Sequence, residues 1–156
     1  LIMVAMDGGQ GINAGGQVTG QSYTPGNAAA HAFLWDGSSM QDLGTLGGTL
    51  SVGYGINASG QVTGSSTTPG NIAQHAFLWD GSSMLDLNDL IPSGSGWILI
   101  SAQGINDAGQ ITGYGILNGQ SHAFLLTPAV PVPEPGTLAL FGVGLAALGL
   151  VRRKCV

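Results

Sequence analysis

The chain has 156 residues, of which 44% are hydrophobic and only 7% are charged, against about 25% charged residues in an average soluble domain. Its length and hydrophobic content allow one body with a buried core and exclude a solvated, disordered chain. All three basic residues lie in the last five positions, so residues 1–151 carry eight acids and no Lys or Arg. A body without cations cannot neutralise phosphates, which argues against nucleic acid as a partner.

The start of the chain suggests that further sequence precedes it. The first residue is Leu1, and no basic stretch followed by an apolar segment and a cleavage site is present near it. We therefore interpret residues 1–10 as the end of an earlier repeat unit and expect more repeats upstream. A single cysteine, Cys155, excludes an intrachain disulfide.

Two sequence blocks recur along the chain and define an internal repeat. The first is GINAGGQVTG at 11–20, GINASGQVTG at 55–64 and GINDAGQITG at 104–113; the second is HAFLWDGSSM at 31–40 and 75–84, shortened to HAFLL at 122–126. Between 11–46 and 55–90, offset by 44 positions, 28 of 36 residues are identical. The predicted units, covering 1–127 in all, are a partial one at 1–10 and then 11–54, 55–103 and 104–127.

The second block has the pattern of a strand hairpin. In an extended chain His75, Phe77 and Trp79 lie on one face and Ala76 and Leu78 on the other. The dipeptide Asp-Gly at 80–81 then predicts a turn into a returning strand at 84–87.

The first block predicts two more strands and their turn. Segments 52–56 and 61–64 are separated by Asn57-Ala58-Ser59-Gly60, and Asn and Gly readily take the backbone angles of a tight turn. About four strands for each unit of about 44 residues predict an all-β fold. We expect a partial β-propeller, with a β-solenoid as the alternative architecture.

These residues resemble a known family. The pattern of GIN, GQVTG, HAFLWDG and, at 42–48, DLGTLGG is similar to the HAF repeat of bacterial extracellular proteins. The resemblance covers nearly all of 11–126, although the second copy departs from it at 87–90 and the third lacks Trp-Asp-Gly after HAF. It implies an exported repeat protein and supplies no reaction.

The composition changes abruptly at Pro128. Residues 128–136 form a Pro-rich linker, residues 137–151 are apolar and uncharged, and Arg152, Arg153 and Lys154 follow at once. We predict one transmembrane helix within 137–156, although 15 residues of helix span only about 22 Å of a hydrocarbon layer about 30 Å thick. The basic residues predict the cytoplasmic side of the inner membrane for the end of the chain.

This tail resembles the PEP-CTERM sorting signal of Gram-negative bacteria, a segment also labelled an ice-binding protein C-terminal domain. The matching residues are Val132, Pro133, Glu134, Pro135 and Gly136, the apolar segment, and the basic residues Arg152, Arg153 and Lys154. The resemblance implies that an exosortase in the inner membrane recognises the motif, cuts near it with its own cysteine, and passes the body to the cell surface or the medium.

The body offers few candidates for chemistry, and no catalytic residue or cofactor is predicted. His31, His75 and His122 take the same place in each unit, which favours a structural role such as a hydrogen bond between strands over a metal site or a general base. The serines at 38–39 and 82–83 follow Asp-Gly and are interpreted as turn residues. Asp36 and Asp80 also favour turns over calcium, because no calcium-loop spacing occurs, and the repeat offers no threonine array for ice binding.

These observations leave three candidate functions. The first is a non-enzymatic, exported surface protein of the extracellular matrix or biofilm, sorted through the tail. The alternative is an exopolysaccharide-binding module that stacks sugars on Trp35 and Trp79, although tryptophans in a hairpin more often belong to the core. The third, an extracellular hydrolase, has no nucleophile and base placed for it.

Overall fold

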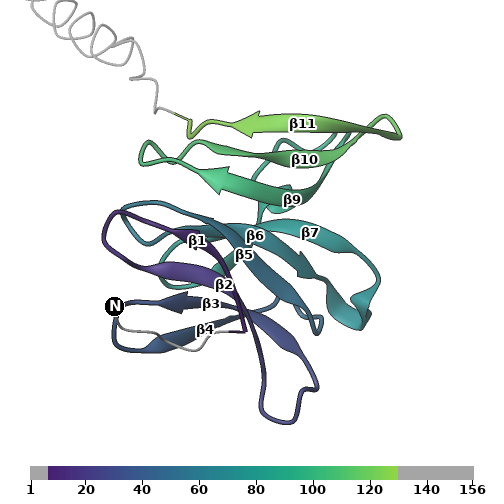
Figure 1. The fold of residues 1–156 in the computed structure, drawn as a ribbon. Helices are drawn as coiled ribbons and strands as arrows, with labels where there is room; N and C mark the ends of the chain where they lie inside the picture. Colours follow the sequence, from purple (N-terminus) through teal and green to yellow (C-terminus); the bar gives the residue numbers. More distant parts are fainter. Residues whose placement is uncertain (1–6, 130–156) are drawn as a thin grey trace, which may run out of the picture.

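A computed structural model describes residues 7–129, which form three antiparallel sheets (Figure 1). The first sheet contains β1 (Gly8–Ile12), β2 (Val18–Tyr23), β3 (Ala30–Trp35) and β4 (Met40–Gly44), and the second contains β5 (Ser51–Ile56), β6 (Val62–Thr67), β7 (Gln74–Trp79) and β8 (Met84–Asp86). The third sheet contains β9 (Trp97–Ile105), β10 (Ile111–Leu117) and β11 (Gln120–Leu126). The short 3₁₀ turns η1 (Pro69–Asn71) and η2 (Leu87–Asp89) lie on either side of β7 and β8.

Each sheet is a meander whose strands pair with their neighbours in sequence. The order is β1-β2-β3-β4, then β5-β6-β7-β8, then β11-β10-β9. The first turn of the second sheet is closed by Asn57, whose Oδ1 accepts hydrogen bonds from the backbone N–H groups of Ser59 (3.1 Å) and Gln61 (3.0 Å). The strands expected at 52–56, 61–64 and 84–87 are present as β5, β6 and β8, although β6 extends to Thr67 and β8 ends at Asp86.

The phenylalanine of the HAF triplet needs a glycine on the adjacent strand. Phe77 on β7 pairs with Gly64 on β6, and a Cβ built on Gly64 would lie 2.6 Å from the ring carbon Cε1 of Phe77. The ring therefore fills the space that a side chain at position 64 would occupy. Phe33 and Gly20 are paired in the first sheet, as are Phe124 and Gly113 in the third.

The three sheets are stacked face to face, so the middle sheet is covered on both sides (Figure 1). Phe77 and Trp79 pack on the first sheet against Ala32 and Leu34. On the opposite face Ala76 packs on the third sheet; its cluster contains Leu87, Leu99, Ala102, Ile111 and Phe124. Both faces of β7 are thus part of the core. This explains why the HAFLW strand carries apolar side chains on both of its faces.

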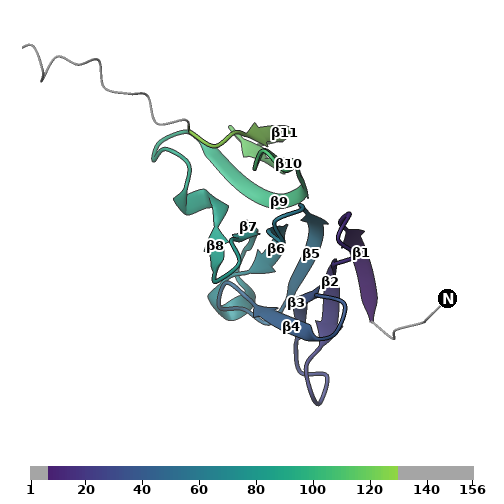
Figure 2. The ribbon, with the colours of Figure 1, turned by 90° about the vertical axis from the view of Figure 1, so that its left-hand side faces the viewer.

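The first strands of the three sheets lie beside one another, with β5 between β1 and β9 (Figure 2). A Cβ on Gly55 would lie 2.9 Å from the Cα of Gly104. Only glycine at position 55 allows the backbones of β5 and β9 to approach this closely.

The predicted fold class needs correction. The described residues are all-β, but they form three stacked antiparallel sheets, and nothing in this arrangement supports a β-propeller. Within 7–129 no helix is long and apolar enough to cross a membrane. The predicted transmembrane helix is therefore not part of this fold; its segment, 137–151, lies outside the described residues, and it was inferred from hydropathy over a length shorter than a bilayer core.

The third sheet also differs from the predicted four-stranded unit, because it has three strands. In the first two units Asp-Gly follows the HAF strand and turns the chain into β4 or β8. After β11 the sequence is Thr127-Pro128 instead. Without that turn, no fourth strand forms within the described part of the chain.

Candidate functional site

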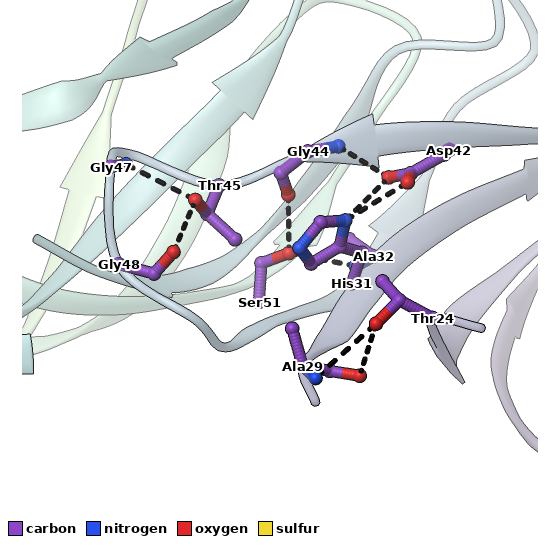
Figure 3. Close-up of polar contacts among 10 residues, drawn as sticks. All are labelled: Thr24, Ala29, His31, Ala32, Asp42, Gly44, Thr45, Gly47, Gly48 and Ser51. Atoms are coloured by element: carbon purple, nitrogen blue, oxygen red, sulfur yellow. Dashed lines mark hydrogen bonds and ion pairs between the residues drawn. The ribbon is translucent and has the colours of Figure 1, made fainter. Parts of the chain in front are cut away.

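His31 and Asp42 join the last two strands of the first sheet. The Nδ1 of His31 on β3 lies 3.0 and 2.9 Å from the two carboxylate oxygens of Asp42 on β4 (Figure 3). A carboxylate can only accept, so Nδ1 carries the hydrogen. Oδ1 of Asp42 also accepts from the backbone N–H of Gly44 at 2.7 Å.

This pair continues into the connection between the first and second sheets. The hydroxyl of Ser51, the first residue of β5, donates to the carbonyl of Gly44 and accepts from the backbone N–H of Ala32 at 2.7 Å (Figure 3). Thr45 closes the loop in between by donating to the carbonyl of Gly48 at 2.9 Å. The network therefore fixes where the chain leaves one sheet and enters the next.

The second unit builds the same connection with a different residue. The Nδ1 of His75 lies 2.6 Å from Oδ2 of Asp86, and Oδ1 of Asp86 accepts from the backbone N–H of Asn88 at 2.8 Å. The Asn88 side chain then bonds to β9: its Nδ2 donates to the carbonyl of Leu99 (3.0 Å), and its Oδ1 accepts from the N–H of Leu99 (2.7 Å). At 87–90, where the second repeat departs from the first, Asn88 thus takes the part that Ser51 has in the first connection.

His122 has a different environment from the other two histidines. It lies on β11, where the third sheet has no further strand to supply an aspartate. Its ring instead meets that of Trp97 edge to face, with 6.3 Å between centroids. The histidine recurs at this position of the sequence, but its hydrogen bond to an aspartate does not recur.

The His31–Asp42 pair has the form of a catalytic dyad, yet its surroundings favour a structural role. Ser22 is paired with His31 across the strands, but its hydroxyl donates to Asp7 at 2.8 Å. The hollow beside the pair holds about 160 Å³, below the roughly 300 Å³ of the smallest usual ligand pockets. In 7–129 no cluster of three or more His, Cys, Asp or Glu side chains is placed to hold a metal.

The two tryptophans considered for sugar binding are packed against the protein. Trp79 is buried between the first and second sheets, and Trp35, its equivalent in the first sheet, is half-buried. Stacking on a sugar requires an exposed ring face. The burial of Trp79 therefore removes one of the two proposed platforms.

Asp36 and Asp80 close the turns that follow the HAF strands. The Asp36 carboxylate accepts from the backbone N–H and hydroxyl groups of both Ser38 and Ser39, at 2.7–2.9 Å. The backbone N–H of Ser39 is the largest of the causes that hold the pKa of Asp36 far below its ordinary value. Asp80 accepts three of the four corresponding bonds, from the N–H and hydroxyl of Ser82 and the N–H of Ser83. The backbone N–H of Ser83 is the main cause of its lowered pKa.

A ladder of asparagines, which the sequence interpretation missed, joins the three sheets. The Nδ2 of Asn13 donates to the backbone carbonyl of Asn57 (2.9 Å), and that of Asn57 donates to the carbonyl of Asn106 (3.2 Å). Each asparagine is the third residue of a GIN block. The recurrence of this asparagine is visible in the sequence, but it predicted only the turn and not the bond to the next sheet. Asp42 and Asp86, each 11 residues after its histidine, were also missed.

The predicted sorting residues lie outside the described residues. They are Val132, Pro133, Glu134, Pro135, Gly136, Arg152, Arg153 and Lys154. Here the comparison with protein families is decisive, because a model described as the PEP-CTERM protein-sorting motif matches residues 131–154. The chain carries a PEP-CTERM sorting motif. No curated protein and no solved structure matches the chain significantly.

The match confirms the predicted PEP-CTERM sorting motif. The motif implies an exported protein that is processed by an exosortase and placed at the cell surface or outside the cell. It covers the tail alone, so the HAF resemblance of the body and the ice-binding label of the tail remain predictions.

Proposed function

We propose that the chain is a non-enzymatic structural protein of the cell surface or extracellular matrix, a biofilm matrix included. The PEP-CTERM motif at 131–154 carries the proposal, because it is a sorting signal and not a reaction site. The body attached to it is a stack of repeated sheets.

The use of the recurring polar side chains supports a structural role for the body. Asn57 bonds to its own turn and to the next sheet, Asp36 closes a hairpin, and His31 joins two strands through Asp42. Groups that recur once per unit are therefore engaged in holding that unit together.

The processing step leaves a body of one charge sign. In this proposal the exosortase at the inner membrane supplies the nucleophile, and Pro133, Glu134 and Pro135 are substrate. A cut near them removes Arg152, Arg153 and Lys154, the only basic residues of the chain. The released body then carries seven Asp and no Lys or Arg, which favours solubility and weak non-specific association in the medium.

A substitution in the motif tests this proposal. In the native host, the triple variant Pro133→Ala, Glu134→Ala, Pro135→Ala should remain with the cells, whereas the unmodified chain reaches the surface and medium. Pro128→Ala, in the same linker but before the matched residues, is the control and should be sorted normally. Equal delivery of the triple variant and the unmodified chain would contradict the proposal.

A further inference from the structure

The outer edge of β11 lacks the fourth strand that borders its equivalents in the other two sheets. β3 pairs with β4 and β7 with β8, whereas within the described residues β11 pairs with β10 alone (Figure 1). Soluble proteins usually protect a free strand edge with charged residues or proline. The sequence of β11, QSHAFLL, contains neither, so this edge has no such protection against further pairing.

An apolar hollow of about 340 Å³ lies along the same strand. It is lined by the four consecutive residues 123–126, so it follows the strand and not one face of the sheet. Trp97 and Leu99 of β9, with Ile91, Pro92 and Ser95 of the loop before β9, complete the lining. Its volume exceeds the roughly 300 Å³ at which ligand sites usually begin.

The second sheet shows what occupies the corresponding place. Met84 of β8 pairs with Trp79 and packs against the core between the first and second sheets. Leu126 is the residue that corresponds to Trp79, 47 positions later. It has no strand beside it to supply an apolar side chain within the described residues, and the hollow lies there instead.

The histidine of β11 lacks the partner that such a strand supplies. In the second sheet Asp86 of β8 pairs with Phe77 across the strands and bonds to the Nδ1 of His75. Within 7–129 only the first two histidines of the repeat are paired with an aspartate, and His122 is exposed. A strand added in the same register would bring an aspartate to His122, and an apolar residue two positions before it would lie opposite Leu126.

The residues that follow β11 do not have the sequence of such a strand. Residues 127–156 contain no Asp and no Met. The prolines at 128, 131, 133 and 135 have no N–H group to donate to a strand, and residues 131–154 belong to the sorting motif. The site involves only the third sheet and the loop before it, at the opposite end of the stack from the first sheet (Figure 1).

We propose that β11 binds an extended segment of a partner protein, which adds a fourth, antiparallel strand to the third sheet. The segment has the pattern of β8: an apolar residue, any residue, then aspartate. Its apolar side chain fills the hollow beside Trp97, and its carboxylate accepts a hydrogen bond from the Nδ1 of His122. In strand addition of this kind, main-chain hydrogen bonds supply affinity, and pockets for alternate side chains supply specificity.

A synthetic peptide with the sequence of residues 82–88, SSMLDLN, is the probe for this site. It carries a fluorescent label, and its polarisation is measured against the full chain, in a mild detergent because residues 137–151 are apolar. The peptide should bind saturably, one to each chain. The peptide variant Met84→Ser should bind about tenfold more weakly, because it leaves the hollow without an apolar side chain.

Methylation of the peptide backbone tests strand pairing. Only alternate N–H groups of an added strand face its neighbour. One peptide is therefore methylated on the amides of positions 84 and 86 and another on those of 85 and 87. One of the two should bind and the other should not, whereas equal affinities would overturn the proposal.

The protein variant His122→Ala tests the contact with the aspartate. It should weaken binding of the original peptide about tenfold and leave binding of the peptide variant Asp86→Ala unchanged, because that peptide has no carboxylate to lose its partner. Ile72→Asp, at a site 87% exposed and outside the hollow, is the control and should bind both peptides normally. Absence of saturable binding to the unmodified chain overturns the proposal, as does an equal effect of His122→Ala on the two peptides.

Discussion

Asn57 closes its own turn and also joins neighbouring sheets, whereas the Asn106 side chain closes only its turn. It closes its own turn through Oδ1, as Asn106 does, and it is 3% exposed. Only Asn57 also donates to the following sheet and receives a bond from the preceding one. The two asparagines therefore separate the energetics of the turn from those of the ladder.

We predict that Asn57→Ala lowers the free energy of unfolding more than Asn106→Ala does. The difference should be about 1–3 kcal/mol, because Asn57→Ala removes the inter-sheet bond as well as the turn and leaves part-buried partners unsatisfied. Urea unfolding of both variants, followed by tryptophan fluorescence, measures it. Equal losses would show that the ladder contributes nothing beyond the turn.

Asp36 gives the fold a dependence on acid. Its pKa is lowered in the folded protein by the backbone N–H groups of Ser39 and Ser38, so the folded state binds the proton more weakly than the unfolded chain. The stabilisation is complete above the ordinary Asp pKa, near 4, and is lost as the pH falls toward the lowered value. The stability advantage of the unmodified chain over Asp36→Asn should therefore be present at neutral pH and shrink below about pH 4. Thermal unfolding across that range measures it, and an advantage independent of pH would contradict this account.

At the scale of the strands, Gly64 and Phe77 are the pair on which the HAF hairpin depends. A Cβ at position 64 would meet the carbonyl of Val52 as well as the Phe77 ring. We predict that Gly64→Ala destabilises the protein by about 2–3 kcal/mol through overpacking. Gly8→Ala, whose Cβ would make an ordinary contact at 3.7 Å with Gln21, is the control and should cost much less. Similar unfolding midpoints for the two variants would contradict the packing argument.

The strands were predictable from sequence because their signals are local. Alternation in HAFLW and the turn residues Asn57 and Gly60 define β7 and the β5–β6 hairpin without reference to the rest of the chain. The stacking was not predictable in the same way. Both Phe77 and Ala76 are apolar, so alternation alone cannot say which neighbouring sheet each face contacts.

The polar connections were harder still to predict, because each joins residues from different elements. His31 was expected to serve its unit, but its partner Asp42 lies on the next strand in a segment that gave no polar signal of its own. Asn88, where the second repeat departs from the first, carries the connection to β9. The divergence between the two repeats thus marks the place where a different side chain makes the connection to the next sheet.

For the whole molecule, the sequence was most informative about destination. The motif at 131–154 was recognisable from local composition, because a sorting enzyme reads a short segment and not a fold. The transmembrane helix, by contrast, was inferred from hydropathy alone and is not part of the fold at 7–129. The sorting signal is therefore readable from a short segment, whereas the fold is not.

The most direct test of the central claim is the intact mass, with C-terminal peptide sequencing, of the protein recovered from the native host's surface and medium. The account predicts a chain that ends near residues 133–136 and lacks Arg152, Arg153 and Lys154. Recovery from the surface and medium of a chain that still ends at Val156 would contradict processing through the PEP-CTERM motif.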